Sequence, residues 1–408
     1  MHGSRGKGLK AARLWLAALA LLALVAPPAA ADNAPGVSDK EIRIGQTMPY
    51  SGPVTAFGTL GKGELAFFRM INDQGGVNGR KIRLVSLDDG YAPPRTVEQT
   101  RKLVELGGVA FLFSSIGTAT NTAVEKYLND RKVPQLFIGS GASKWGDYKD
   151  HPWTIGGVQG VFRAEARIYT RYLLQHQPNP KLAILYQNDD SGLDYVAGVK
   201  DVLGDKYAGM VTEATYEFTD ATVDSQIASL QGAGANAFIL AATPKFAAQA
   251  IRKAYDIGWK PMFFLSNVAI WVNSVMKPAG EEKAVGIISS AYVKDPTDSG
   301  WDNDPGMRQW RAFMDKYMPD ADHSDQNYVN SYNSGMALVQ VLKQCGNDLS
   351  RRNIMKQAAN LHDLELPMLL PGIKVNTRPT DYYPVEQMQL MRWDGARWVR
   401  FGEILSGS

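Results

Sequence analysis

The sequence predicts an α/β protein with doubly wound, mostly parallel sheets, because strand and helix patterns alternate and then start again. The clearest unit is residues 42–90, which reads as a strand, a glycine-rich turn, an amphipathic helix, a tight turn and a second strand. Two sets of such strand–helix units follow each other and join near Thr154–Arg163. Since 408 residues are enough for two domains of ordinary size, we expect two α/β domains.

Residues 1–31 have the organisation of a secretory signal peptide. Four basic residues precede the apolar run Leu14–Ala26, and Ala29-Ala30-Ala31 gives a small-x-small cleavage site before Asp32. A transmembrane span is the alternative interpretation, but the apolar run is about half as long as a span requires. We therefore expect export to the periplasm. Loss of the four basic residues would take the formal net charge from +3 to about −1, which gives no argument for nucleic acid or an anionic membrane as a partner.

Cys345 is the single cysteine, so an intramolecular disulfide is impossible. No cysteine stands at the end of the signal peptide, where it could accept a lipid. We therefore expect an exported, soluble protein that depends on its hydrophobic core for stability.

The helices and strands are bounded by turn residues along the whole chain. In the opening unit, Gly75-Gly76 ends the helix and Asn78-Gly79 turns the chain into the next strand. The first half predicts strands at 42–48, 82–87, 109–113 and 135–138, with helices at 58–72, 93–106 and 119–129. The second half predicts strands at 181–186, 211–218, 237–241, 262–265 and 287–293, with helices at 195–203, 223–231 and 244–255.

The last hundred residues change character. Helices are predicted at 305–318, 326–344 and 350–359, followed by strands at 387–393 and 397–404 around an Asp394-Gly395 hairpin turn. A chain that leaves a helical region and returns to β-structure indicates that it crosses between the two domains more than once.

Catalytic, nucleotide and metal motifs are incomplete in this sequence. Gly61-Lys62-Gly63 lacks both the spacer and the following Ser or Thr of a phosphate loop, and no G-x-S-x-G motif occurs. The five histidines are far apart, which argues against a zinc site. Asp88-Asp89 and Asp189-Asp190 follow strands, where aspartate usually caps a helix or turn, so we favour structural roles over acid–base roles. We expect no cofactor, no metal and no catalytic activity.

Loops that follow strands in the first half carry small and hydroxyl-bearing residues, at Gly117-Thr118 and Gly141-Ala142-Ser143. Such residues let a ligand approach the backbone, and hydroxyls with helix-start N–H groups can bind a carboxylate. Aromatic residues lie in or near loops of the same kind, and each could equally be part of the core: Tyr50, Phe57, Tyr91, Trp145, Phe246 and Trp271. Polar anchors and apolar walls without an acid–base set favour binding over catalysis.

With these residues in view, the chain resembles the periplasmic leucine/isoleucine/valine-binding protein family, the type I substrate-binding proteins of ABC importers. The resemblance rests on five segments: IRIGQTMPYSGPVTAFG, INDQGGVNGRKIRLVSLDD, KVPQLFIGSGAS, KLAILYQNDDSG and AIRKAYDIGWKP. It implies two Rossmann-like lobes with parallel sheets, joined by a three-stranded hinge and closing on a small-molecule ligand. It also implies a monomer that docks on the membrane permease of an ABC importer. The lobes would be 32–157 with 290–370, and 158–289 with 371–408.

The resemblance also implies a set of ligand-binding residues. The family's aromatic wall falls on Phe57, and the groups that hold the ligand carboxylate fall on Gly117, Thr118, Gly141, Ala142 and Ser143. In the second lobe, contacts fall on Ser191, where the family has an aromatic residue, and on Thr243 or the adjacent Pro244. The acidic residue that receives an amino acid's ammonium group falls on Asn267.

Asn267 is the most informative departure from the family. A buried ammonium group without a carboxylate partner costs several kcal/mol. We therefore hypothesise an aromatic or aliphatic acid without an ammonium group, on which Trp145 or Trp271 could stack.

Branched-chain amino acid or amide binding is the alternative ligand class. A ligand-sensing module of the same fold and an exported α/β enzyme are the alternative functions. The family's cysteine pair is also absent, since Tyr91 and Ile116 occupy those regions.

Overall fold

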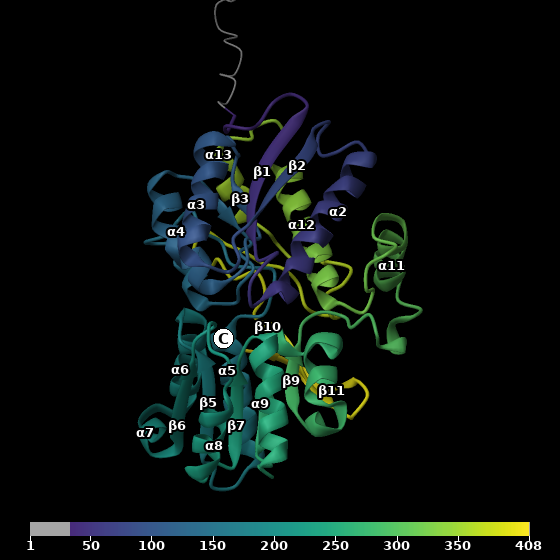
Figure 1. Ribbon diagram of the computed structural model, residues 1–408. Coiled ribbons are helices and arrows are strands. Elements are labelled where there is room, and N and C mark those ends of the chain that lie inside the picture. Colours follow the sequence, from purple (N-terminus) through teal and green to yellow (C-terminus); the bar gives the residue numbers. More distant parts are fainter. Residues whose placement is uncertain (1–32, 408) are drawn as a thin grey trace, which may run out of the picture.

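The computed structural model describes residues 33–407, so the predicted signal peptide at 1–31 lies outside the described residues. Two lobes, each built on one sheet, lie one above the other (Figure 1). The first sheet has the order β2-β1-β3-β4 and the second has the order β11-β10-β9-β8-β7-β5-β6. All strand pairs are parallel except those that β10 makes with β9 and β11. The α/β class with parallel-dominated sheets is therefore confirmed.

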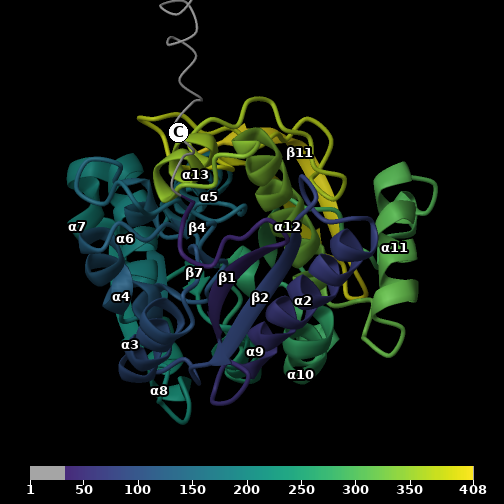
Figure 2. The same ribbon diagram turned by 90° about the horizontal axis from the view of Figure 1, so that it is seen from above.

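The first lobe contains the predicted opening unit. Its strands are β1 (Glu41–Met48), β2 (Lys81–Asp88), β3 (Leu112–Phe113) and β4 (Gln135–Leu136). Its helices are α2 (Gly58–Asp73), α3 (Pro93–Arg101), α4 (Thr118–Asp130), α11 (Pro305–Tyr317), α12 (Gln326–Cys345) and α13 (Arg351–Ala358), with short turns η1 (Thr55–Phe57) and η2 (Lys102–Leu106). Viewed from above, α3 and α4 lie on one side of β1 and β2, and α2 and α12 on the other (Figure 2).

The second lobe contains the larger sheet. Its strands are β5 (Leu182–Gln187), β6 (Val211–Tyr216), β7 (Ala237–Ala241), β8 (Met262–Leu265), β9 (Ile288–Ala291), β10 (Gln387–Trp393) and β11 (Trp398–Ser406). Its helices are α5 (Phe162–His176), α6 (Asp190–Leu203), α7 (Tyr207–Met210), α8 (Asp224–Gly232), α9 (Pro244–Asp256) and α10 (Lys277–Ala279). Strands β5 and β7 are buried along their whole length, as expected for a sheet covered on both faces.

Several elements differ from the sequence prediction. Helix α5 was not predicted, because it occupies the join between the two repeating sets. Helix α6 starts at Asp190 rather than Tyr195, since the Asp189 carboxylate accepts hydrogen bonds from two backbone N–H groups in the first turn. Strand β3 starts at Leu112 and not at residue 109, and strand β4 ends at Leu136 and not at residue 138. Ser114 and Phe137, one residue after each strand, have φ of 50° and 52°, a backbone conformation that cannot continue a strand.

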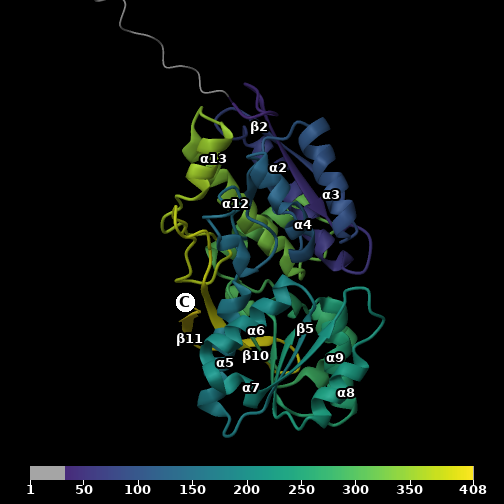
Figure 3. The same cartoon turned by 90° about the vertical axis from the view of Figure 1, so that its left-hand side faces the viewer.

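Three segments cross between the lobes, at about 155–162, 291–294 and 383–388. The first and third are neighbours, because Gly160 forms a parallel bridge with Val385. The second and third are neighbours as well, since β9 pairs with β10. Figure 3 shows the last of these segments passing from the first lobe down to β10. This arrangement is the three-stranded hinge that the resemblance implied.

The segment 371–384, which the sequence assigned to the second lobe, contacts the first lobe. The Thr377 N–H donates to the Leu361 carbonyl oxygen at 2.9 Å, and Val375 forms an antiparallel bridge with Leu364. Tyr382 packs edge-on against Tyr148, with ring centroids 6.1 Å apart. We therefore propose that the first lobe extends to about residue 384, with the third crossover near Val385.

Glu64 is a fully buried carboxyl group in the first lobe, on helix α2. The side-chain amide of Gln46 on β1 donates to Glu64 Oε2, whereas Glu64 Oε1 has no hydrogen-bond partner. Burial raises the pKa of Glu64 to about 8, because its effect is larger than that of the hydrogen bonds, which lower the pKa. The folded protein therefore holds Glu64 as the neutral acid at neutral pH.

Replacing Glu64 should flatten the pH dependence of stability. An unfolded glutamate has a pKa of about 4.3, so folding takes up a proton between that pH and about 8, and the unfolding free energy falls as pH rises through this window. Glu64→Gln removes this slope, which is at most about 1.4 kcal/mol per pH unit. Urea unfolding from pH 5 to 8.5 measures it, with the exposed Glu403→Gln as the control. Equal slopes in Glu64→Gln and the parent would contradict a neutral Glu64.

Candidate functional site

A cavity that is partly open to solvent lies between the two lobes; the unfilled space within it, including the open part, is about 920 Å³. Both lobes and the crossovers contribute to its lining. Its polar side chains include Thr118, Ser140, Gln159, Gln187, Ser191, Thr243, Ser266, Asn267, Ser290, Gln326, Asn327 and Asn330. None of the lining residues, all of which belong to the described range 33–407, is Asp, Glu, Lys, Arg or His. The cavity therefore presents hydrogen-bonding groups without ionised side chains.

The cavity brings together most of the residues that the resemblance assigned to a ligand. In the first lobe these are Phe57, Gly117 and Thr118, and in the second lobe Ser191, Thr243 and Asn267. Trp271, one of the two candidate stacking residues, also lines the cavity. These residues span more than two hundred positions of the sequence, from Phe57 to Trp271, and they come together where the two lobes meet.

Gly141, Ala142 and Ser143 do not line the cavity, which corrects their predicted place. A side-chain carbon on Gly141 would lie 2.4 Å from the carbonyl oxygen of Gly160, so this glycine allows the first crossover to approach. The hydroxyl of Ser143 donates to Asp194 Oδ1 in the second lobe at 2.5 Å. The cavity is lined instead by Gly139 and Ser140, directly before them. Pro244, the alternative to Thr243, opens helix α9 and is also absent from the lining.

The start of helix α4 forms one end of the cavity. Gly117, the residue before the helix, has φ of 101°, and a side chain there would meet the ring of Tyr91 at 2.5 Å. Glycine is therefore required by both the backbone and the packing. The first N–H groups of a helix have no partner within the helix and carry a partial positive charge. The Gly117 N–H already donates to the Gly139 carbonyl oxygen at 3.2 Å, so it is the helix start from Thr118 onward that provides a place for a negatively charged or strongly polar group.

The Thr118 hydroxyl is free to donate into the cavity. Ser140 Oγ accepts hydrogen bonds from Trp145 Nε1 at 3.0 Å and from the Ala142 N–H at 3.2 Å. Since both lone pairs of Ser140 Oγ are occupied, its own proton goes to Thr118 Oγ1, 2.6 Å away. The Thr118 proton is then left for another acceptor. Trp145, buried outside the cavity, positions Ser140, and it is not placed to stack on a ligand.

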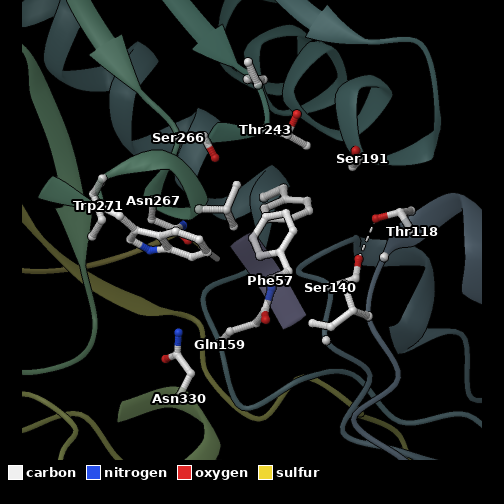
Figure 4. A pocket seen from close by; sticks show the side chains of 18 of the residues that line it. Phe57, Thr118, Ser140, Gln159, Ser191, Thr243, Ser266, Asn267, Trp271 and Asn330 are labelled. Atoms are coloured by element: carbon white, nitrogen blue, oxygen red, sulfur yellow. Dashed lines mark hydrogen bonds between the residues drawn. The ribbon is translucent and has the colours of Figure 1, made fainter. Parts of the chain in front are cut away.

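Aromatic rings from the two lobes meet across the cavity. Phe57 packs edge-on against Trp271, with ring centroids 5.1 Å apart and an interplanar angle of 84°. Figure 4 shows this pair in the middle of the cavity, between the polar side chains of both lobes. Tyr91 from the first lobe lies against Phe218 of the second, with centroids 5.7 Å apart. Of these rings, Phe57, Tyr91 and Trp271 line the cavity and provide apolar walls for an aromatic or aliphatic body.

Polar contacts outside the cavity also connect the lobes. Asp190 at the start of α6 accepts hydrogen bonds from Thr122 at 3.1 Å and Lys144 at 3.0 Å, both in the first lobe. On the Trp271 side of the cavity, Asn273 donates to Ser324 Oγ at 2.7 Å. Asp189, the residue before Asp190 in the predicted acidic pair, caps helix α6. Asp190 thus ties the lobes together and Asp189 has the structural role that its position predicted.

Asn267 follows strand β8 and is 5% exposed. Its backbone N–H donates to Glu165 Oε1 at 3.1 Å, and its side-chain amide also faces the Glu165 carboxyl group. Asn267 therefore connects the cavity lining to this buried acid.

Glu165, on the unpredicted helix α5, is a buried carboxylate directly behind the cavity. Its Oε1 also accepts from Tyr169 Oη at 2.6 Å and Ser290 Oγ at 2.5 Å, and its Oε2 accepts from Tyr195 Oη. Burial raises the pKa of Glu165, and these hydrogen bonds oppose that shift. Since Asn267, Ser290 and Tyr195 line the cavity, one carboxylate holds much of the second-lobe face in place.

Glu165 is the main residue that the sequence prediction missed. Apolar residues at Phe162, Ala166, Tyr169 and Leu173 recur at helical spacing, and Glu165 lies on the same side as this buried stripe. An acidic residue on an apolar helix face is a signal that could have identified it. The side-chain amides of helix α12 that line the cavity, such as that of Asn330, had no local sequence pattern that could have identified them. Asn330 Oδ1 accepts from Tyr292 Oη on the second crossover at 3.1 Å.

Residues 33–407 contain neither a candidate membrane span nor a candidate metal site. No helix in that range is both long and apolar enough to span a bilayer. No group of three or more His, Cys, Asp or Glu side chains within it could hold a metal ion.

Comparison with known proteins gives consistent matches. A family model described as periplasmic binding protein matches residues 41–397. The Leu/Ile/Val-binding protein homolog 1 of Brucella abortus (strain 2308) is 24% identical over 314 residues, which cover 76% of this chain and 80% of that protein. These matches confirm the resemblance that the sequence motifs predicted.

Solved structures show the same fold. A branched-chain amino acid ABC transporter protein from Thermus thermophilus, with bound valine, has a TM-score of 0.79 at 14% identity, covering 91% of this chain and 97% of that one. A fatty acid ABC transporter substrate-binding protein from Thermomonospora curvata has a TM-score of 0.74 at 21% identity, covering 93% and 96%.

Proposed function

The chain belongs to the periplasmic binding protein family, and we propose that it binds a small organic acid without an ammonium group in the cavity between its lobes. It would then deliver this ligand to the membrane permease of an ABC importer. The ligand carboxylate would lie at the start of α4, against Gly117 and the Thr118 hydroxyl, and its aromatic or aliphatic body against Phe57 and Trp271.

The observation that carries this proposal is the absence of any acidic side chain among the lining residues. An ammonium group enclosed here would lose its hydration without gaining a carboxylate, which costs several kcal/mol. A carboxylate would meet the unpaired N–H groups of a helix start and a hydroxyl whose proton is free. The related Thermomonospora curvata protein is named for fatty acids, which carry a carboxylate and no ammonium.

A branched-chain amino acid is the second candidate, because the Thermus thermophilus structure holds valine. Glu165 would have to provide the negative charge for its ammonium group. However, Glu165 does not line the cavity, and its two oxygens already accept four hydrogen bonds. We therefore favour an acid.

The test compares ligands that differ only in the ammonium group. Thermal unfolding of the purified protein is followed with 4-methylpentanoate against leucine, and with 3-phenylpropionate against phenylalanine, within a wider panel of acids and amides. A ligand at 100 times its dissociation constant stabilises by about 2.7 kcal/mol, which gives a clear rise in Tm. We expect such a rise with acids and none with their amino acid partners. Tight leucine binding with no response to any acid would contradict the proposal.

Trp271→Ala should weaken the binding of 3-phenylpropionate by about tenfold or more, because a buried aromatic wall contributes roughly 2 kcal/mol or more to a contact of this kind. Titration calorimetry measures the dissociation constant. Trp259→Ala is the matched control, since Trp259 is equally buried in the second lobe but lies outside the cavity lining. It should lower stability and leave the dissociation constant unchanged. An equal loss of affinity in both variants would mean that Trp271 acts only through stability.

A further inference from the structure

Tyr91 and Phe218 form an aromatic contact between the lobes, which we call the clasp. Tyr91 follows strand β2 of the first lobe and Phe218 follows strand β6 of the second, and their ring centroids are 5.7 Å apart with an interplanar angle of 80°. Tyr91 lines the cavity, whereas Phe218 does not. The clasp therefore links a residue of the cavity wall to a residue of the other lobe that lies outside the cavity.

Phe218 covers a small apolar cluster of the first lobe. The buried members of this cluster are Met48, Val54, Leu60, Tyr91 and Ile116. Phe218 packs against the cluster from the second lobe, and Tyr91 is only 4% exposed. The Tyr91 hydroxyl faces the side-chain amide of Gln187, which also belongs to the second lobe. Separation of the lobes would expose part of this cluster to water, at a cost in free energy that grows with the apolar area exposed.

The first lobe holds the Tyr91 ring in this position. Tyr91 has φ of 60°, which is unusual for an aromatic residue and persists where the surroundings fix it. The Asp89 carboxylate fixes it, because it accepts the Tyr91 N–H and the Thr96 hydroxyl, each at 2.9 Å. Gly117 leaves room for the ring, since a side-chain carbon there would lie 2.5 Å from Tyr91 Cε2. The ring therefore contacts both the approach to helix α4 and the second lobe.

The clasp lies at the sheet edges remote from the crossovers. Strand β2 is the edge strand opposite β4, and β4 is joined to the start of the first crossover by the bridge between Gln135 and Thr154. Strand β6 is the edge strand of the second sheet, four strands from β9, or roughly 19 Å at the usual strand spacing. A rotation about the crossovers therefore separates the two residues of the clasp more than it separates contacts beside the hinge.

We propose that the clasp of Tyr91 and Phe218 holds the lobes together over a bound ligand and sets the rate at which the ligand is released. Opening withdraws Phe218 from the first-lobe cluster before the ligand leaves, so the clasp slows dissociation. Association begins with the lobes apart and the clasp unformed, so its rate is little affected. This role goes beyond the proposed function, because it requires a ligand between the lobes but does not depend on whether that ligand is an acid or an amino acid.

The test measures ligand release by stopped-flow fluorescence, with Trp271 in the cavity as a reporter. The probes are 3-phenylpropionate and leucine, one for each candidate ligand class. Phe218→Ala should raise the dissociation rate constant about tenfold and change the association rate constant by less than about twofold. Since Phe218 lies outside the cavity lining, faster release in this variant cannot come from a lost ligand contact.

Phe401→Ala is the matched control. Phe401 is also a partly exposed phenylalanine of the second lobe, its ring packs against Tyr172 with centroids 5.8 Å apart, and it lies outside the cavity lining. Its replacement should leave both rate constants unchanged. An increase in the release rate equal to that of Phe218→Ala would mean that any loss of packing in the second lobe has this effect, and would overturn the clasp.

Substitutions of Tyr91 test whether the two rings act as one unit. Tyr91→Leu removes the ring that Phe218 packs against, so adding Phe218→Ala to it should raise the release rate no further. Tyr91→Phe keeps the ring and loses only the hydroxyl that faces Gln187, so it should raise the release rate less than Tyr91→Leu does. It also preserves the shape of the cluster in case Tyr91→Leu folds poorly. Additive effects of Tyr91→Leu and Phe218→Ala would contradict a shared clasp.

The outcomes separate this inference from the proposed function. Equal release rates in Phe218→Ala and the parent protein overturn the clasp and leave acid binding untouched. If leucine binds and 3-phenylpropionate does not, the proposed function fails, and the release of leucine still decides on the clasp. If no acid or amino acid of the thermal unfolding panel binds, both fail.

Discussion

Glu165→Ala is expected to destabilise the second lobe by about 3–5 kcal/mol and to weaken ligand binding. The substitution removes the acceptor of four donors in a fully buried place. Tyr169 Oη can turn its single proton to the Leu265 carbonyl oxygen, 2.8 Å away, and Tyr195 Oη can still bond with Ser266 Oγ. The Asn267 N–H, in contrast, loses the one partner that it has here. Urea unfolding measures the change in free energy.

The functional part of this prediction needs a variant that folds well. Glu165→Gln keeps one oxygen acceptor and nearly the same shape, so we expect a smaller loss of stability, about 1–2 kcal/mol. Its effect on ligand binding should be larger than its effect on stability, because Asn267 loses its fixed support. The readout is the dissociation constant for 3-phenylpropionate. An unchanged dissociation constant in Glu165→Gln would limit Glu165 to a structural role.

The architecture was largely predictable because it depends on local patterns. In β1–α2–β2, the periodicity of apolar residues gives the element type, and Gly75-Gly76 ends the helix without help from distant residues. The buried strands β7 and β8 were predicted at their observed bounds for the same reason. Helix α5 was missed, although its apolar spacing is regular, because it lies where the two repeating sets join.

The candidate site was predictable in part, because it depends on contacts between distant residues. Gly141–Ser143 were expected in the cavity, but the Phe137 backbone with φ of 52° lies within a loop that brings Gly139 and Ser140 there instead. No local pattern reveals that turn. The role of Glu165 depends on partners up to 125 positions away, such as Ser290. The contact of Asn267 with Glu165, 102 positions away in sequence, is likewise a property of the assembled cavity.

Asn267→Asp is expected to weaken the binding of 3-phenylpropionate by about a hundredfold at pH 7.5, which corresponds to about 2.7 kcal/mol. The change replaces an uncharged donor with a carboxylate in a cavity that has no basic lining residue. The new carboxylate would also lie beside Glu165, whose Oε1 is 3.1 Å from the backbone nitrogen of residue 267. It would therefore repel both a ligand carboxylate and Glu165.

The pH dependence of this variant separates charge from shape. Burial and the neighbouring Glu165 should raise the pKa of the new carboxyl group, so that it becomes neutral as pH falls. A neutral carboxyl group can donate a hydrogen bond as Nδ2 does, and binding should recover toward pH 5. Asn267→Leu, which has no titrating group, should show no such recovery.

Binding that is weak at every pH in Asn267→Asp would indicate a change of shape. Tight binding at pH 7.5 would place position 267 away from the ligand. A gain of phenylalanine binding in Asn267→Asp would show that this position decides between acids and amino acids.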